Sequence, residues 1–212
     1  MIDGKTWQRP LVTMLAAGML AISLQGCVEM AIGTAVVGAL AATDRRTLGA
    51  QTEDKGIELK GANRIATLVG EAGHVNVNSF NRKVLLTGEV RDAQMKAAVE
   101  REMAAVENVQ SIVNELEIAG PSSFGSRSSD TLITGKVKAS FVDARDLFAN
   151  SFKVVTERGV VYLMGRVTER EGTRAAEVAS GVSGVRKVVK VFDYISEDEL
   201  KRLSASSGGK QQ

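Results

Sequence analysis

The chain has 212 residues, which suits one medium domain or two small ones, and it carries a formal net charge of +2. Its 44% hydrophobic and 25% charged residues are the ordinary mixture of a folded protein. So small a charge gives no support for nucleic acid as a partner. A single cysteine excludes a disulfide framework, and a single histidine excludes most histidine-dependent catalysis.

The amino terminus has the pattern of a bacterial lipoprotein signal. Basic residues precede an apolar stretch of 14 residues, 11–24, shorter than the roughly 20 that a membrane span needs. The stretch ends in "LQGC", with a leucine three residues before Cys27 as in a lipobox, although Gln25 departs from the usual small residue. We predict a signal peptide at 1–26 and lipidation of Cys27.

Two alternatives stay open for this segment: a buried or membrane-spanning helix at 11–42, or an ordinary signal peptide that leaves a free cysteine. If Cys27 is lipidated, Val28 follows it instead of the aspartate that commonly retains lipoproteins in the inner membrane. Resemblance to the lipoprotein class then implies lipid anchoring in the outer membrane, with the body facing the periplasm. Residues 27–54 are predicted to be the anchor and a polar tether, including the unexplained apolar segment 31–42.

The rest of the chain contains two copies of one unit. Residues 75–90 align with 152–167 at an offset of 77, and Gly88 and Gly165 coincide in this alignment. A duplicated small domain explains two copies, because a solenoid needs more repeats.

Each copy begins with apolar residues at i, i+4 and i+8, such as Ile133, Val137 and Phe141, which predict one buried helix face. Two strands with alternating apolar residues, a second helix and a last strand follow. The predicted fold is α+β: two αββαβ units, each a three-stranded mixed sheet with two helices on one face.

The boundaries follow from composition. We predict the first domain at 55–118, a Gly-, Pro- and Ser-rich linker at 119–129, the second domain at 130–195 and a disordered tail at 196–212. Asp130 is the predicted N-cap of the second domain's first helix.

Gly88 and Gly165 fall inside strand patterns. A glycine at such a position marks a bulge or a close approach by another backbone or helix. We predict that both are structural and admit a helix packed on the sheet.

The αββαβ unit with a glycine inside a strand is similar to the BON domain, and two units behind a lipobox resemble the dual-BON outer-membrane lipoproteins. The resemblance rests on "LQGC", "ATDRRTLGAQ", "VNVNSFNRKVLLTGEV", "SDTLITGKV" and "VVYLMGRVTERE". It implies a non-enzymatic factor of envelope integrity that is associated with division sites. It also implies binding of anionic phospholipid, phosphatidylglycerol or cardiolipin, through the second domain.

The charge of the second unit agrees with such a ligand. Residues 55–118 hold 8 basic and 9 acidic side chains, whereas 127–195 hold 12 and 8. Each Lys or Arg close to an anionic membrane surface contributes about 1 kcal/mol.

Leu132 lies about 100° away from the inward stripe of its helix, on the side of Lys136. An apolar side chain beside a cation suits the membrane interface. The predicted lipid-binding residues are Leu132, Ile133, Lys136, Lys138 and Ala139. The family commonly has an aromatic residue where Leu132 stands, so leucine is a departure that weakens anchoring.

Two alternatives remain for this face. Leu132 packs on the first copy or the linker, or the protein is a periplasmic scaffold for outer-membrane assembly or cell-wall proteins. No catalytic residue, metal ligand or cofactor is predicted. His74 has no partner in the sequence pattern, and "GVSG" at 181–184 lacks the lysine of a phosphate loop.

Overall fold

The computed structural model describes residues 44–120 and 122–208, so the signal peptide, Cys27 and segment 31–42 lie outside the described range. The elements of the first domain are α2 (Leu48–Val69), η1 (Gly70–Ala72), β1 (His74–Phe80), β2 (Lys83–Val90), α3 (Ala93–Ala104), β3 (Ser111–Asn114) and β4 (Glu117–Ile118). Those of the second are α4 (Phe124–Asp143), η2 (Ala149–Ser151), β5 (Phe152–Glu157), β6 (Val160–Val167), α5 (Glu169–Ser180) and β7 (Lys187–Tyr194). Helix α6 (Glu197–Gly208) follows. The predicted αββαβ order is confirmed in both domains.

Both sheets are mixed and have the same topology. Strand β2 pairs antiparallel with β1 and parallel with β3 and β4, and β6 pairs antiparallel with β5 and parallel with β7. Each domain has a core between its sheet and its two helices, built around Ile65, Leu86 and Met103 in the first domain. Phe141 and Leu163 belong to the corresponding core of the second domain.

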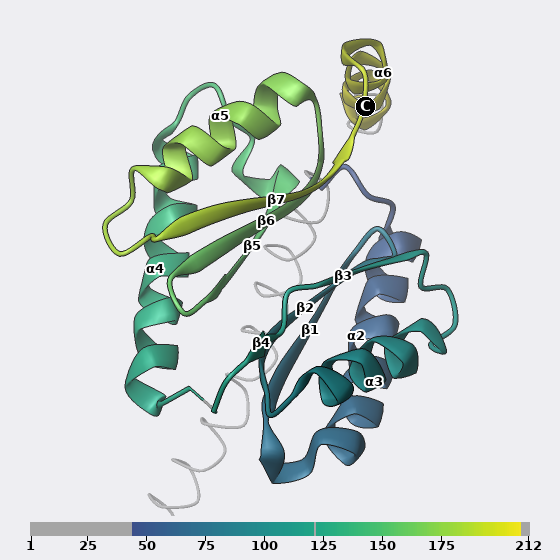
Figure 1. The fold of residues 1–212 in the computed structure, drawn as a ribbon. Coiled ribbons are helices and arrows are strands. Elements are labelled where there is room, and N and C mark those ends of the chain that lie inside the picture. Colours follow the sequence, from purple (N-terminus) through teal and green to yellow (C-terminus); the bar gives the residue numbers. More distant parts are fainter. Residues whose placement is uncertain (1–43, 121, 209–212) are drawn as a thin grey trace, which may run out of the picture. The chain divides into compact units, whose positions relative to one another are not determined.

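The two sheets also pack on each other through a third apolar cluster. It contains Phe80, Leu85, Tyr162, Met164 and Val191. Figure 1 accordingly shows four layers, with α2 and α3 on one side, α4 and α5 on the other, and the two sheets between them. Seven of the eight residues of β2 are buried, including those that alternation alone would turn toward water.

Asp54 of α2 and Asp130 of α4 hold the hairpin turns of the two domains. Asp54 accepts hydrogen bonds from the Asn81 and Arg82 amides at 2.7 and 2.8 Å. Asp130 accepts two from the amides of the β5–β6 turn, both at 2.8 Å. The positive φ angles of 52° at Asn81 and 65° at Arg82 suit a two-residue hairpin of type I′.

Helix α4 begins earlier than predicted. Ser123, not Asp130, is its N-cap and accepts a hydrogen bond from the Ser126 amide at 3.2 Å. The predicted linker at 119–129 is therefore wrong from Phe124 on. Serine and glycine are weak helix formers, but the cap and the bonds of the buried Asp130 to the hairpin turn offset this weakness.

The end of the predicted tether at 27–54 is also part of the folded body. Helix α2 begins at Leu48, and the Thr47 hydroxyl accepts a hydrogen bond from a first-turn amide at 3.1 Å. Before the helix, Arg46 pairs with Asp54 at 2.8 Å. The polar residues that suggested a tether supply this cap and this ion pair.

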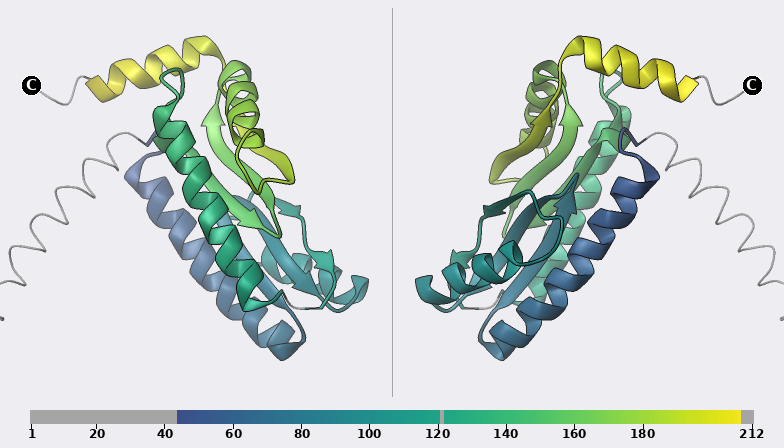
Figure 2. Two further views of the ribbon diagram at one scale, coloured as in Figure 1. Left: turned by 90° about the vertical axis from the view of Figure 1, so that its left-hand side faces the viewer. Right: turned by 90° about the vertical axis from the view of Figure 1, so that its right-hand side faces the viewer.

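Helix α6 occupies most of the predicted disordered tail at 196–212, whose last four residues lie outside the described range. Its first turn is acidic, and negative side chains there interact favourably with the positive end of the helix dipole. The Ser196 hydroxyl accepts a hydrogen bond from the Glu199 amide at 3.1 Å, and Glu199 pairs with Arg166 of β6. Figure 2 shows α6 projecting from the second domain.

Gly88 and Gly165 admit the backbone at the start of the neighbouring strand, not a helix as predicted: His74 is the first residue of β1, and Ser151 directly precedes β5. A Cβ on Gly88 would lie 2.0 Å from the His74 carbonyl oxygen, and one on Gly165 would lie 2.5 Å from that of Ser151. Gly88 also has a φ of 114°, which side chains rarely tolerate. Both clashes involve backbone, which has little freedom to move.

Candidate functional site: the outer face of α4

Three large apolar side chains of α4 are exposed: Phe124 by 82%, Leu132 by 67% and Val142 by 72%. With 3.6 residues per turn, positions 124 and 142 fall on one line along the helix, and position 132 lies about 80° from it. Together with the exposed Gly135 and Ala139 they form an apolar band about 27 Å long. We call these five residues the α4 stripe.

Ile133 is wrong as a lipid-binding residue. It is 6% exposed and belongs to the core of the second domain, so close to Gly184 that a Cβ there would lie 3.0 Å from Ile133 Cγ1. The other four predicted residues are exposed: Leu132, Lys136, Lys138 and Ala139. The exposure of Leu132 also contradicts the alternative in which this side chain packs on the first copy or the linker.

Sequence reasoning missed Phe124 and Val142. Phe124 was placed in the linker, because the glycine and serines after it are poor helix formers. Ser123, followed three residues later by Ser126, was the available signal, since serine is a favoured N-cap. Val142 lies 18 residues after Phe124, which is five full turns, so the correct helix start would have placed both on one face.

Lysines flank the α4 stripe on its two sides. Lys136 lines an open hollow of about 600 Å³ between α4 and the end of α5, together with Asp143 and Glu177. Lys138 lines a groove of about 390 Å³ that α4 shares with α2, with Lys55 on the opposite wall. The α4 stripe is thus bordered by one exposed lysine on each side.

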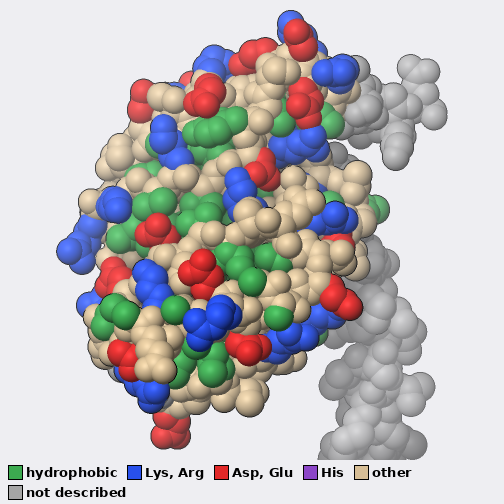
Figure 3. Space-filling view, turned by 45° about the vertical axis from the view of Figure 1, so that its right-hand side comes forward, with side chains coloured by type: hydrophobic (Ala, Val, Ile, Leu, Met, Phe, Trp, Pro, Cys, Tyr) green, Lys and Arg blue, Asp and Glu red, His purple; other side chains and the backbone are tan. Residues whose placement is uncertain are grey.

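The two domains differ in how their cations are paired. In 55–118, five of the eight Lys and Arg residues form ion pairs. In 127–195, five of the twelve do so, within the described part of the chain. The seven without an ion pair are Arg127, Lys136, Lys138, Arg145, Arg186, Lys187 and Lys190. Unpaired cations are therefore more numerous in the second domain, with seven against three in the first. Figure 3 shows acidic and basic side chains interspersed on the face that it presents.

A charged contact in the wall of this groove joins the domains. The Lys153 ammonium pairs with Glu58 and donates to the Ser79 carbonyl at 3.2 Å. Burial alone would raise the pKa of Glu58, but Lys153, Lys55 and the Ser79 amide hold it below its usual value. Burial lowers the pKa of Lys153, and Glu58 offsets this effect only in part. The contact is structural and leaves Lys138 as the exposed cation of the α4 wall.

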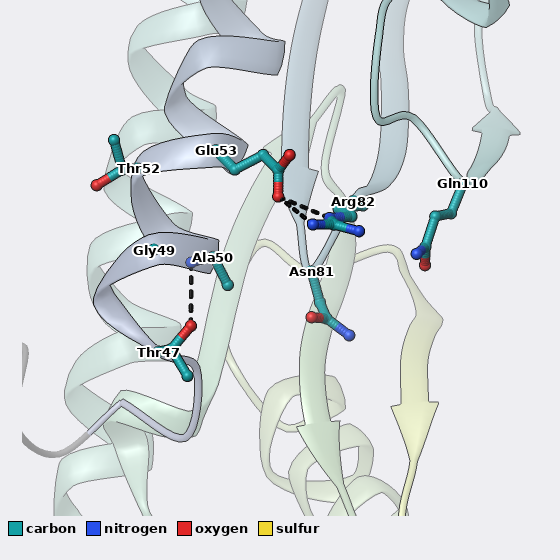
Figure 4. Close-up of a pocket in the computed structure, with 8 residues that line it drawn as sticks. All are labelled: Thr47, Gly49, Ala50, Thr52, Glu53, Asn81, Arg82 and Gln110. Atoms are coloured by element: carbon teal, nitrogen blue, oxygen red, sulfur yellow. Dashed lines mark hydrogen bonds and ion pairs between the residues drawn. The ribbon is translucent and has the colours of Figure 1, made fainter.

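A larger hollow, of about 780 Å³, lies between the start of α2 and the β1–β2 turn (Figure 4). Its two titratable residues, Glu53 and Arg82, pair with each other at 2.6 Å. Thr47 in its wall caps α2. These side chains are committed to each other or to the fold, and they do not form a nucleophile with a base.

The other residues weighed for chemistry have structural places. His74 is the first residue of β1 and half-buried. Glu171 closes a capping box with Thr168 at the start of α5. Among the described residues, no group of three or more His, Cys, Asp or Glu side chains is placed to hold a metal ion. In the same part of the chain, no helix is both long and apolar enough to cross a bilayer.

Comparison with known proteins identifies the family of this chain. The family model of the BON domain matches residues 54–120 and 129–196. The chain is 41% identical over 177 residues, 82% of its length and 91% of the relative's, to the outer membrane lipoprotein DolP of Haemophilus influenzae. It is 32% identical over 154 residues, 72% of its length and 79% of the relative's, to a 21 kDa hemolysin of Actinobacillus pleuropneumoniae. A solved chain of CdsD, a structural protein of the type III secretion system of Chlamydia trachomatis, aligns at 12% identity over 67% of this chain and 96% of its own, with a TM-score of 0.29.

Proposed function

The chain belongs to the BON-domain family as a two-domain, DolP-like lipoprotein of the outer membrane, and from this premise we propose that its α4 stripe binds anionic phospholipid. The exposure of Phe124, Leu132 and Val142 on one helix face is the observation that carries the proposal. Withdrawing a large apolar side chain fully from water contributes about 1.5–3 kcal/mol. Three such side chains within about 80° of one another around the helix support insertion of α4 along the membrane interface.

The unpaired cations of the second domain supply the preference for anionic lipid. Lys136 and Lys138 flank the α4 stripe, and each contributes about 1 kcal/mol near an anionic surface. This term is screened by salt, whereas the apolar term is not. Phosphatidylglycerol and cardiolipin are therefore the lipids proposed for this face.

The anchor and the α4 stripe have different tasks in this proposal. A lipid anchor at Cys27 keeps the protein on the membrane, and the stripe selects where on the membrane it stays. Retention in regions rich in anionic lipid, such as division sites, is how the protein serves envelope integrity. The role is non-enzymatic, since BON-domain lipoproteins are not a known enzyme family.

Vesicle co-sedimentation of a form that begins after Cys27, and so lacks both the predicted signal peptide and the anchor, tests the proposal. We expect binding to phosphatidylglycerol or cardiolipin vesicles and little binding to phosphatidylcholine vesicles. Leu132→Glu abolishes the binding. Leu59→Glu is the matched control, because Leu59 of α2 is 65% exposed but lies in the first domain. Equal binding of all three proteins to anionic vesicles contradicts the proposal.

A periplasmic scaffold for outer-membrane assembly or cell-wall remodelling factors is the second candidate. It is favoured by apolar side chains that remain exposed in the first domain, Leu48 by 69% and Leu59 by 65%. The two functions separate in cells. If the scaffold is correct, Leu59→Glu impairs resistance to detergents while vesicle binding stays intact, whereas lipid binding predicts that only Leu132→Glu does so.

A further inference from the structure

Two adjacent arginines bind different domains where the chain enters the described body. Arg45 donates from both terminal nitrogens to the two carboxylate oxygens of Glu171, at 2.8 and 2.7 Å, and to the Arg166 carbonyl at 3.0 Å. Its guanidinium also lies 5.9 Å from the centroid of the Phe148 ring. All three partners belong to the second domain.

Arg46 binds the first domain instead. Its Nη1 donates to the Asp54 carboxylate at 2.8 Å, and its guanidinium lies 3.9 Å from the centroid of the Phe80 ring. Asp44 pairs with the same arginine at 2.6 Å. Asp54 is the residue that holds the β1–β2 turn, so Arg46 is connected to the sheet of the first domain.

The acceptors of both arginines are buried. The side chains of Glu171 and Asp54 are 3% and 2% exposed, and those of Arg45 and Arg46 are 10% and 14% exposed. A buried carboxylate that loses its cation is left with an uncompensated charge, which is strongly unfavourable. Consecutive Cα atoms lie about 3.8 Å apart. Both arginines therefore keep their partners only when Glu171 and Asp54 stand in one fixed relation.

We propose that residues 44–47, the strap, fix the placement of the two domains relative to each other. The apolar cluster between the sheets drives their association, but apolar contact is non-directional and does not by itself select one rotation. A bidentate pair of arginine with carboxylate has a defined geometry and does select one. The apolar surfaces thus drive the association of the two domains, and the strap selects one relative orientation.

The strap also connects the anchor to the second domain. Residues 1–43 precede the strap, and Arg45 binds the domain that carries the α4 stripe. Pulling or bending of the chain before Asp44 is therefore transmitted to both domains together. The fixed placement itself does not depend on lipid binding.

Pulsed electron spin resonance on the full chain in detergent tests the strap. Nitroxides on Leu59→Cys of α2 and Lys190→Cys of β7, two exposed positions, report the distance between the domains. Each single cysteine is measured alone, so that a label on Cys27 is recognised. We expect one narrow distance distribution for the otherwise unchanged chain and at least a doubling of its width in Arg45→Gln/Arg46→Gln.

The matched control is Arg91→Gln/Arg174→Gln, which removes exposed ion pairs within each domain, one at Arg91 and two at Arg174, and should leave the width unchanged. If the circular dichroism of Arg45→Gln/Arg46→Gln shows that this variant does not fold, the distance distribution of Arg45→Gln/Glu171→Gln tests the proposal instead. That variant leaves no unpaired charge, and glutamine can still serve in the capping box. A folded strap variant with the narrow distribution of the control overturns the proposal.

Discussion

Glu58 of α2 and Lys153 of β5 form an ion pair that joins the two domains at the edge of their stacked sheets. Their side chains are 16% and 24% exposed, so the pair is largely shielded from water. The Lys153 ammonium also donates to the Ser79 carbonyl of β1 at 3.2 Å. One cation of the second domain thus satisfies two acceptors of the first.

Glu58→Gln should destabilise the protein by about 3 kcal/mol, because it leaves the ammonium of Lys153 buried without a counter-charge. The measurement is the midpoint of urea unfolding. Glu107→Gln is the control, since it removes a pair with Lys60 whose side chains are 79% and 58% exposed. We expect the control to change stability by less than about 0.5 kcal/mol. Equal shifts in both variants would show that the Glu58 pair is no more important than a surface pair.

Replacement of Glu157 by glutamine should stabilise the protein, in contrast to replacement of Glu58. Burial, and after it the charges of Glu89 and Asp130, raise the pKa of this carboxyl above 4.5, although the Asn76 amide partly compensates. A raised pKa in the folded state means that ionisation above that pKa opposes folding. Glu157→Gln, which can still accept the Asn76 hydrogen bond, should therefore stabilise the protein at pH 7. The gain should disappear below pH 4.5, where the carboxyl is protonated in both states.

The measurement for Glu157→Gln is thermal unfolding at pH 7 and pH 4. A control with the opposite sign is Glu171, whose pKa Arg45 and the Thr168 amide hold low against burial. Stability from Glu171 is present at neutral pH and is lost as the pH falls through its folded-state pKa. Glu171→Gln should thus destabilise the protein at pH 7. If Glu157→Gln destabilised the protein at pH 7, the raised pKa of the Glu157 carboxyl would be contradicted.

Gly88→Val and Gly165→Val should destabilise their domains by about 3 and about 2 kcal/mol. Both create a clash with a backbone carbonyl, and Gly88 in addition requires its positive φ. Gly135→Ala of α4 is the control, because a Cβ there meets nothing within 4 Å. Alanine at this helical position should stabilise the protein by about 0.5–1 kcal/mol. Differential scanning calorimetry that showed unchanged melting for both valine variants would refute the structural role of the two glycines.

Leu132→Trp should strengthen binding to anionic vesicles by several-fold, because an indole ring prefers the membrane interface. The tryptophan count of the chain is one, and that residue, Trp7, lies in the predicted signal peptide. The new tryptophan is then the sole one of the processed protein, and its fluorescence should shift to the blue on binding. Leu59→Trp, equally exposed on α2, should show no shift. A shift at position 59 and none at 132 would place the contact on the first domain.

The order of helices and strands was predictable because each element carries its own period. Ile133, Val137 and Phe141 recur every four residues, and all three are buried. The stacking of the two sheets was not predictable, since Leu85 lies on a face that alternation assigns to water. Local patterns distinguish apolar from polar positions along one element, but they do not show that a second copy will cover the other face.

The α4 stripe could be predicted only in part, for a similar reason. Leu132 stood out as an apolar residue off the buried stripe of its helix. Phe124 did not, because the weak helix formers after it made the segment look like a linker. Ile133 was included among the lipid-binding residues although its spacing already placed it on the buried stripe. Arg45 and Arg46 were placed in a tether because no local pattern indicates a partner 126 residues away, such as Glu171.

The stacked sheets also constrain how this protein can evolve. Leu85 of one copy and Tyr162 of the other belong to the same buried cluster, so a change of shape in one copy alters what the other must fit. We therefore expect a substitution in this cluster in one domain to be accompanied by a compensating substitution in the other. A descendant that deleted one half would expose a bare apolar sheet to water. Once the two faces had adapted to each other, the duplication could no longer be reversed by simple loss.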